Sequence, residues 1–142
     1  MKKTLVLLLS CIIFLSSCNG YTENQVHWEF EHSYYEVKMI KIVNAEDAYS
    51  FSTIEIIDLN LKTLLLDDIK GINMKNYHGS LSHPYGISIL VEFQNGDYDI
   101  ISSIEPKHCT MVNGNIIAHN SWLYCEQNDF NAILNKYYTT FS

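Results

Sequence analysis

The segment Tyr85–Ile104 reads YGISILVEFQNGDYDIISSI and carries the clearest structural signal in the chain. Its centre, Asn95-Gly96, lies between two runs rich in β-branched and aromatic residues. Asn-Gly is the strongest short hairpin signal because both positions accept positive φ angles. A two-residue loop sets the strand pairing, and here it predicts that Phe93 faces Tyr98. The apolar residues of both strands then share one side of the sheet, in agreement with the turn.

The same register places acidic residues together on the opposite side of this hairpin. Glu92 is expected opposite Asp99, and Asp97 lies beside the turn. Three carboxylates at a loop tip could bind Ca²⁺. Two of them could instead serve as the carboxylate pair of a glycoside hydrolase if they shared a cleft. Their spacing is not that of an EF-hand, and a solvated acidic tip that discourages edge-to-edge aggregation is the simpler interpretation.

Asn113-Gly114 repeats the turn signal later in the chain. A two-residue loop there predicts three cross-strand pairs: Thr110 with Ile117, Cys109 with Ala118, and His108 with His119. Two facing imidazoles are weak candidates to share Zn²⁺ or Cu²⁺, so metal handling is one alternative function. No His-x-x-x-His or Cys-x-x-Cys motif supplies a third ligand, and a polar pair facing solvent is the simpler interpretation.

Periodicity predicts the remaining elements. A C-terminal helix capped by Asp129 is expected to bury four apolar residues at helical spacing: Phe130, Ile133, Leu134 and Tyr137. Strands are expected upstream at Val26–Glu31, Tyr35–Val43, Ser52–Asp58 and Lys62–Leu66, the last two joined as a hairpin by Leu59–Leu61, with a short helical turn ending at Gly71. These elements predict an α+β domain: an antiparallel β meander of about six strands with a C-terminal α-helix packed on one face.

Composition allows one domain and disfavours a nucleic-acid partner. The chain has 142 residues, with 9 basic residues against 16 acidic ones and a net charge of −7. The sequence contains no Gly-rich phosphate loop and no Gly-x-Ser-x-Gly elbow, so no catalytic motif directs the interpretation.

The N-terminus has the layout of a secretory signal peptide. Lys2 and Lys3 precede the apolar run Thr4–Leu15, and small residues follow it. The run is too short, at roughly 12 residues, to span a hydrocarbon core of about 30 Å. Residues 1–17 are therefore expected to be removed.

Leu15-Ser16-Ser17-Cys18 resembles a bacterial lipobox, in which a hydrophobic residue and two small residues precede an invariant cysteine. The resemblance implies that Cys18 carries covalent diacylglycerol and a fatty acid such as palmitate, becomes the first mature residue and anchors the chain in the bilayer. Each buried CH₂ contributes about 0.8 kcal/mol to such an anchor. The expected organisation is a signal peptide at 1–17, a lipidated cysteine and tether at 18–25, and a single α+β domain at 26–142. The expected location is the bacterial cell membrane or outer membrane, exposed outside the cytoplasm.

The order of features from Ser52 to Tyr138 resembles that of small uncharacterised bacterial lipoproteins from AT-rich genomes. These features are a strand ending in DLNLK, two hairpins that turn at Asn-Gly, and the terminal helix FNAILNKYY. The resemblance lies in the order of these features, includes no diagnostic motif and supplies no catalytic residue.

Cys109 and Cys125 are the two cysteines of the expected domain. Outside the cytoplasm such a pair is expected to be oxidised, and closing a loop of roughly 15 residues would stabilise the protein by about 3 kcal/mol. The predicted hairpin places Ala118, not Cys125, opposite Cys109. If Asn120-Ser121 forms a second tight turn, the cysteines lie two strands apart, beyond the Cα separation of about 7 Å that a disulfide allows; if the chain curls back after Trp122, they can meet. A disulfide and two buried free thiols both remain open.

The longest segment without periodicity, Asn73–Pro84, is where we expect partner contacts, because loops carry binding residues while a sheet holds them in place. Four residues in it and at its end are candidates: Tyr77, His78, His83 and Tyr85. The loop histidines and the acidic group also make a small envelope hydrolase an alternative function.

The function that these features favour is a membrane-anchored envelope lipoprotein that acts as a non-catalytic binding module. Aromatic residues make up 13% of the chain, and exposed Tyr and Trp form good contact surfaces for proteins and glycans. The expected partner is a protein or glycan, as for an immunity, inhibitor or envelope-assembly protein. No cofactor beyond the acyl groups on Cys18 is expected.

Overall fold

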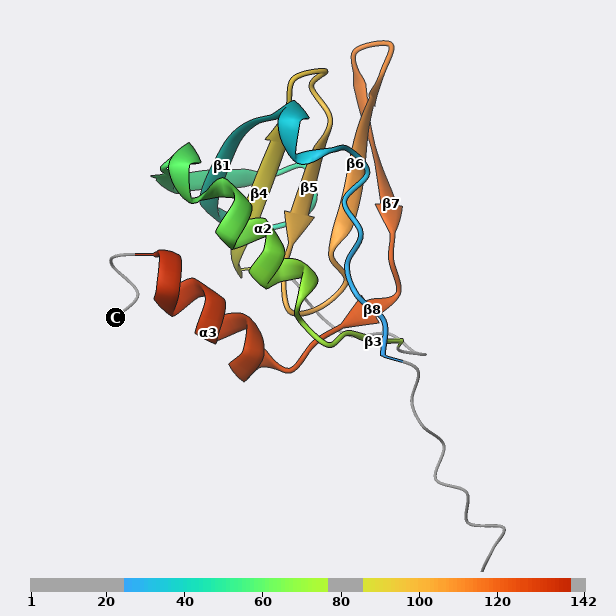
Figure 1. Cartoon of the computed structure of the whole chain (residues 1–142). Coiled ribbons are helices and arrows are strands. Elements are labelled where there is room, and N and C mark those ends of the chain that lie inside the picture. Colours follow the sequence, from blue (N-terminus) through green and yellow to red (C-terminus); the bar gives the residue numbers. More distant parts are fainter. Residues whose placement is uncertain (1–24, 77–85, 139–142) are drawn as a thin grey trace, which may run out of the picture.

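Six antiparallel strands form the main sheet in the computed structural model, which describes residues 25–76 and 86–138 (Figure 1). Their order across the sheet is β2-β1-β4-β5-β6-β7. The bounds are β1 Val37–Ala45, β2 Phe51–Ile57, β4 Gly86–Phe93, β5 Tyr98–Ile101, β6 Lys107–Val112 and β7 Asn115–Asn120. The predicted α+β class, with its antiparallel sheet and C-terminal helix, is confirmed.

Two helices cover one face of this sheet (Figure 1). Helix α2 is Lys62–Lys70 and helix α3 is Gln127–Tyr137. Helix α3 buries all four residues of the predicted stripe, and it begins before Asp129, with Glu126 at the N-cap position. A second, two-stranded sheet pairs β3 (Lys75–Asn76) with β8 (Leu123–Tyr124) beside the helices.

The strand predicted at Lys62–Leu66 is wrong, because this run lies within α2. A 3₁₀ turn, η2 (Leu59–Leu61), follows β2 and leads directly into the helix. The carboxylate of Asp58 accepts a hydrogen bond from the Asn60 backbone and starts that turn. Helical spacing then buries three side chains of the run against the sheet: Leu65, Leu66 and Ile69. The helix ends at Gly71, as the sequence indicated.

The segment predicted as the first strand is extended but does not join the main sheet. We call residues 25–33 the strap. Its side chains alternate, as expected for the strand predicted at Val26–Glu31, with Trp28 only 2% exposed and Glu29 and Glu31 facing out. Its one β-bridge joins Val26 to Met74. In Figure 1 the strap runs across the helix-covered side of the sheet and leads through the 3₁₀ turn η1 (Tyr34–Glu36) into β1.

The two Asn-Gly hairpins have different outcomes. The β6–β7 pairing is confirmed residue by residue, including His108 opposite His119. The predicted β4–β5 register is wrong by one residue: Glu92 faces Tyr98, and Val91 faces Asp99. The β4–β5 loop contains three residues, because the Phe93 N–H donates to the Asp97 carbonyl at 2.9 Å. A slip of one residue moves every side chain of β5 to the other face.

The core consists of two clusters, one on each face of the sheet. The larger cluster lies under the strap and helices and contains Trp28, Phe93 and Phe130. The smaller one lies on the opposite face and contains Leu90, Tyr98 and other residues. Within the residues that the structure describes, no helix is both long and apolar enough to span a membrane.

Candidate functional site

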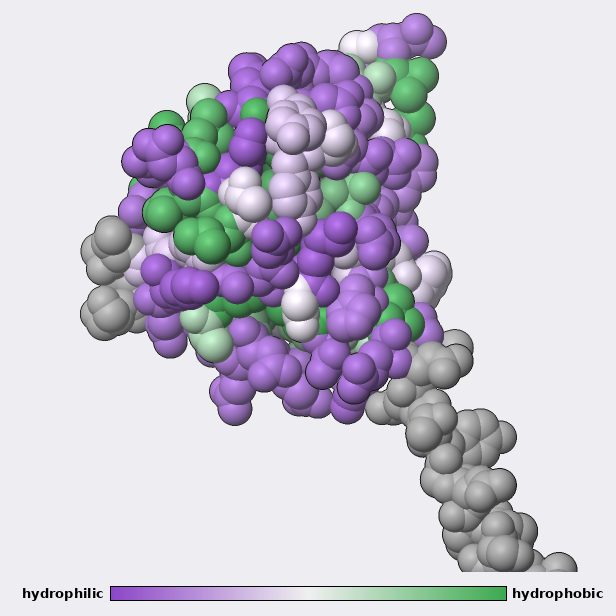
Figure 2. All heavy atoms as spheres, viewed as in Figure 1, coloured by the Kyte–Doolittle hydropathy of each residue, from purple (hydrophilic) through white to green (hydrophobic). Residues whose placement is uncertain are grey.

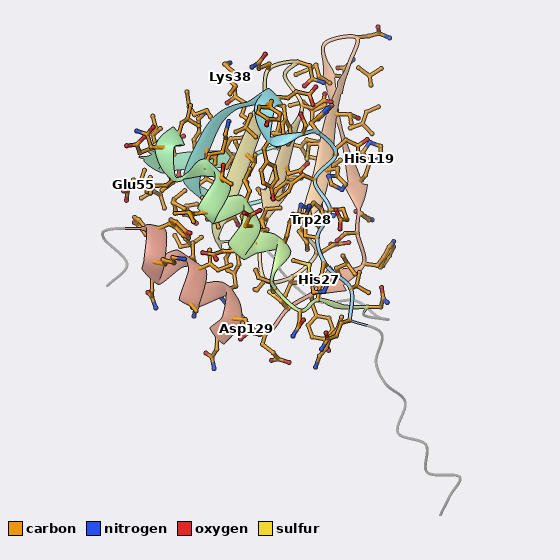
Figure 3. The ribbon with its side chains drawn as sticks, viewed as in Figure 1. His27, Trp28, Lys38, Glu55, His119 and Asp129 are labelled. Atoms are coloured by element: carbon orange, nitrogen blue, oxygen red, sulfur yellow. The ribbon has the colours of Figure 1, made fainter. Side chains whose placement is uncertain are left out.

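A buried aspartate on β5 ties the strap to the sheet. Asp99 is 1% exposed, and its carboxylate accepts hydrogen bonds from His108 Nδ1 at 2.8 Å and from the Trp28 indole at 3.3 Å. The Trp28 and His108 rings stack with their centroids 4.3 Å apart. Figure 3 labels Trp28, which lies where the strap crosses the sheet. The strap is therefore held at this point by packing and by hydrogen bonding.

Burial and hydrogen bonding both shift the pKa values of the Asp99–His108 pair. Burial raises the pKa of the Asp99 carboxyl, although the hydrogen bond from His108 opposes the shift. Burial alone would lower the pKa of His108, but the hydrogen bond and the charge of Asp99 outweigh it, so this pKa is raised. Both shifts favour keeping a proton on the pair.

Asp97 makes a second connection to the strap. One carboxylate oxygen accepts from His32 Nε2 at 2.8 Å, and the other accepts from the Met111 backbone at 2.8 Å. Burial acts to raise the pKa of Asp97, but these hydrogen bonds dominate and lower it. Asp97 thereby joins the β4–β5 turn, β6 and the strap.

A cavity of about 500 Å³ lies between the strap and α2, and residues from both ends of the helix line it. We call it the strap pocket. One side is lined by Phe30 of the strap and by Tyr34 and Tyr35 of η1, and the helix side by Lys62, Thr63 and Lys70. The volume falls within the range of small-ligand sites, and aromatic walls with a few polar groups are typical of such sites.

The aromatic wall of the strap pocket is held in place by its neighbours. Phe30 and Tyr34 meet edge to face at 6.0 Å, and the Tyr34 hydroxyl donates to Asp67 at 2.9 Å. Burial and the hydrogen bond to Asp67 raise the pKa of Tyr34 to about 12, so the phenol remains a hydrogen-bond donor. Tyr35 is 90% exposed, and its ring is available to a ligand.

The two lysines of the strap pocket differ in their charge environment. Lys70 lies 3.6 Å from Glu29 and 5.7 Å from the centre of the Tyr34 ring. Within the described part of the chain, Lys62 contacts no carboxylate, whereas every other lysine contacts one. The chain has an excess of acidic residues, so a lysine at a cavity without a carboxylate beside it can bind an anionic group of a ligand.

A second hollow, of about 430 Å³, lies between the end of α2 and α3. Lys136 on its wall is already engaged by Asp68 at 2.7 Å, and aromatic residues are absent from its described lining. Both features make it a poorer ligand site than the strap pocket.

The predicted acidic cluster of Glu92, Asp97 and Asp99 does not form. The true register turns Asp99 toward the strap, whereas Glu92 bonds Lys38 at 2.8 Å and Lys41 at 3.0 Å. The paired lysines hold the pKa of Glu92 below its usual value. The three carboxylates therefore do not share a Ca²⁺ site or a hydrolytic cleft.

His108 and His119 face each other as predicted, but each ring has another partner. His108 bonds Asp99, and His119 Nε2 lies 3.0 Å from the Thr110 hydroxyl. Figure 3 shows His119 on the outermost strand of the sheet. Among the described residues there is no group of three or more potential metal ligands. Metal binding by the pair therefore stays an untested alternative.

Cys109 and Cys125 are buried free thiols, so the possible disulfide is not formed. The physical reason is the sheet itself: Cys109 belongs to the smaller cluster on one face, and Cys125 belongs to the larger cluster on the other. Burial raises the pKa of each thiol to about 11, which keeps both sulfurs protonated and unreactive.

Five predicted site residues lie outside the described residues: Cys18, Tyr77, His78, His83 and Tyr85. The described start of the predicted loop is structured, because Met74 bonds Val26 and Lys75–Asn76 form β3. The strap pocket was not predicted. The signal for it was the aromatic spacing from Phe30 to Tyr34-Tyr35, but only the position of α2 shows that these rings line a cavity.

No family model, no curated protein and no solved structure matches this chain.

Proposed function

We propose that the protein is a membrane-anchored envelope lipoprotein whose domain is a non-catalytic binding module for a protein or glycan partner. The observation that carries the proposal is the strap pocket, with its three aromatic residues and the ammonium group of Lys62, which pairs with no carboxylate among the described residues. Aromatic rings and a cation supply contact area and orientation to a ligand.

The lipobox supports the anchored part of the proposal. Residues 19–24 separate Cys18 from Gln25, where the strap begins. A fully extended chain of that length spans about 25 Å, so an acylated Cys18 would hold the start of the strap within about that distance of the bilayer. Removal of Lys2 and Lys3 makes the body more acidic than the whole chain, and anionic head groups would repel it.

Replacing Cys18 tests the anchor. The Cys18→Ser variant should lose acylation and stay uncleaved by the lipoprotein signal peptidase, as followed by fatty-acid labelling and by the size of the chain. Normal cleavage together with normal acylation in this variant would contradict the lipoprotein proposal.

Chemical cross-linking in envelope extracts tests the pocket, with the protein purified from cells in detergent as bait. Tyr35→Ala should abolish capture of the partner, because it removes the most exposed ring of the strap pocket. Tyr49→Ala is the matched control: Tyr49 is 58% exposed and follows Ala48 of the opposite core cluster. Equal capture by both variants would show that the binding site lies outside the strap pocket.

A further inference from the structure

We propose that the strap pocket accepts an extended peptide segment bearing a carboxylate, which adds as a strand to the open edge of the strap. The inference rests on the proposed function, because it names the class of partner that the same pocket binds. Three observations carry it: an extended segment with unused backbone groups, a helix on the opposite side, and an unpaired cation between them.

The strap has the conformation of a strand but few of its hydrogen bonds. Within the described residues, the main-chain N–H and C=O groups of His27–His32 bond to no protein group. Val26 differs, because its N–H and C=O exchange hydrogen bonds with Met74 at 3.2 and 2.8 Å. Backbone polar groups require partners, and a strand without neighbours is a template for one.

The contact at Val26 shows which edge faces the pocket. Both main-chain groups of Val26 point toward Met74, which follows α2 by four residues in the chain. In an extended chain, alternate residues present their N–H and C=O to the same edge. The main-chain groups of Trp28 and Phe30 therefore share the edge of Val26, and Phe30 lines the strap pocket.

Helix α2 supplies the other wall. A segment between an extended edge and a helix can use main-chain hydrogen bonds for affinity and alternate side chains for specificity. Lys62 has no counter-charge among the described residues and can pair with a carboxylate through a charge-assisted hydrogen bond. The exposed ring of Tyr35 offers an apolar contact beside it. Because other described lysines contact carboxylates, Lys62 is the group that orients the peptide.

An apolar surface adjoins this wall and is suited to a longer peptide. Figure 2 shows apolar side chains gathered over the start of α2. Three leucines there are exposed: Leu59 by 45%, Leu61 by 39% and Leu64 by 57%. A segment that passes Lys62 would meet these side chains next.

Selection from a library of random displayed dodecapeptides tests the inference, with the protein purified from cells in detergent. Selected peptides should share an aspartate, a glutamate or a free C-terminus next to apolar residues at alternate positions. A synthetic copy should then bind Lys62→Ala about tenfold more weakly, which corresponds to about 1.4 kcal/mol. Lys38→Ala is the matched control, since Lys38 is 57% exposed and lies on β1, away from the pocket lining.

N-methylation of the selected peptide tests strand addition directly. Removing an N–H should weaken binding at least about tenfold at every second position and little at the positions between, because only alternate residues face the strap. The Phe30 amide resonance should also shift when the peptide binds. Sensitivity without this alternation, or equal binding to wild type and Lys62→Ala, would overturn the inference.

Measuring the binding of an acidic oligosaccharide distinguishes failure of this inference from failure of the proposed function. If the protein binds an acidic oligosaccharide, loses it in Tyr35→Ala, and selects no peptide, the binding module stands and the peptide inference falls. If neither peptide nor oligosaccharide binding responds to Tyr35→Ala or Lys62→Ala, both proposals fall.

Discussion

The two hairpins of this protein share the dipeptide Asn-Gly and close with different loops. In β6–β7, Asn113 and Gly114 have φ angles of 50° and 79° and form the two-residue turn that the dipeptide favours. In β4–β5, Gly96 takes a positive φ of 92° and Asn95 does not, so the loop also includes Gln94. Asn-Gly thus marks a turn in both places without specifying its length.

The surroundings of the two turns explain the difference. The tip of the β6–β7 hairpin extends past the residues of β6 that pair with β5, so local preference decides its geometry (Figure 1). The β4–β5 turn is held by its neighbours, because the Gln94 N–H donates to the Glu36 carbonyl at 2.8 Å. The longer loop also turns Asp99 toward Trp28, where it secures the strap. Tertiary contacts therefore outweigh the local preference at this turn.

Removing Asp99 should have the largest effect. Asp99→Ala leaves the buried Trp28 N–H and His108 without their acceptor, and loss of one partner from a buried pair costs about 3 kcal/mol or more. Urea unfolding measures the change. His119→Ala is the control, because His119 faces His108 but is exposed, and it should change the free energy of unfolding by less than about 0.5 kcal/mol. Equal effects would show that the register does not place Asp99 in the core.

Glycine substitutions should distinguish the two asparagines. Asn113→Gly should leave the free energy of unfolding almost unchanged, because glycine accepts the positive φ at no steric cost. Asn95→Gly should cost about 1 kcal/mol, since the Asn95 side chain bonds both the backbone and the carboxylate of Asp97. Thermal unfolding of both variants checks the difference, and equal losses would contradict it.

Deleting Gln94 should shorten the three-residue β4–β5 loop to a two-residue turn like that of the β6–β7 hairpin. Asn95-Gly96 would then connect Phe93 to Asp97 as a two-residue turn, and the pairing of Glu92 with Tyr98 should survive. Loss of the hydrogen bonds from Gln94 to the η1 turn should cost about 1 kcal/mol. Cross-strand nuclear Overhauser effects measure the register. A shift that pairs Phe93 with Tyr98 would mean that the loop, and not the Asp99 contacts, determines the pairing.

A pH titration should give the smallest effect. The ring of His108 should titrate above its usual pKa of about 6.5 in proton NMR, and Asp99→Asn should lower the midpoint. Because the folded-state pKa is raised, the stabilising contribution is present at low pH and lost as the pH rises through that value. We expect less than about 1 kcal/mol, as the ring is partly exposed. A His108 midpoint that Asp99→Asn leaves unchanged would contradict the coupling.

Several features of the fold were predictable from the sequence because local physics determines them. The α3 stripe follows helical periodicity, and the β6–β7 register follows a turn that few neighbours constrain. Alternation in the strap correctly predicted which side chains are buried, since an extended chain alternates whether or not it joins a sheet. The antiparallel α+β class followed from these elements.

The site depended on contacts between segments far apart in the sequence. The run Lys62–Leu66 has an apolar content that suits a strand or a helix, and the sheet face that it covers selected the helix. The strap pocket exists because α2 lies beside Tyr34 and Tyr35, which no local pattern specifies. The one-residue slip at β5 has the same origin: burying Asp99 against Trp28 and His108 stabilises a loop that its own residues do not prefer. Local sequence determines the elements, and packing between distant elements determines the register and the cavity, because only in the folded chain do those groups meet.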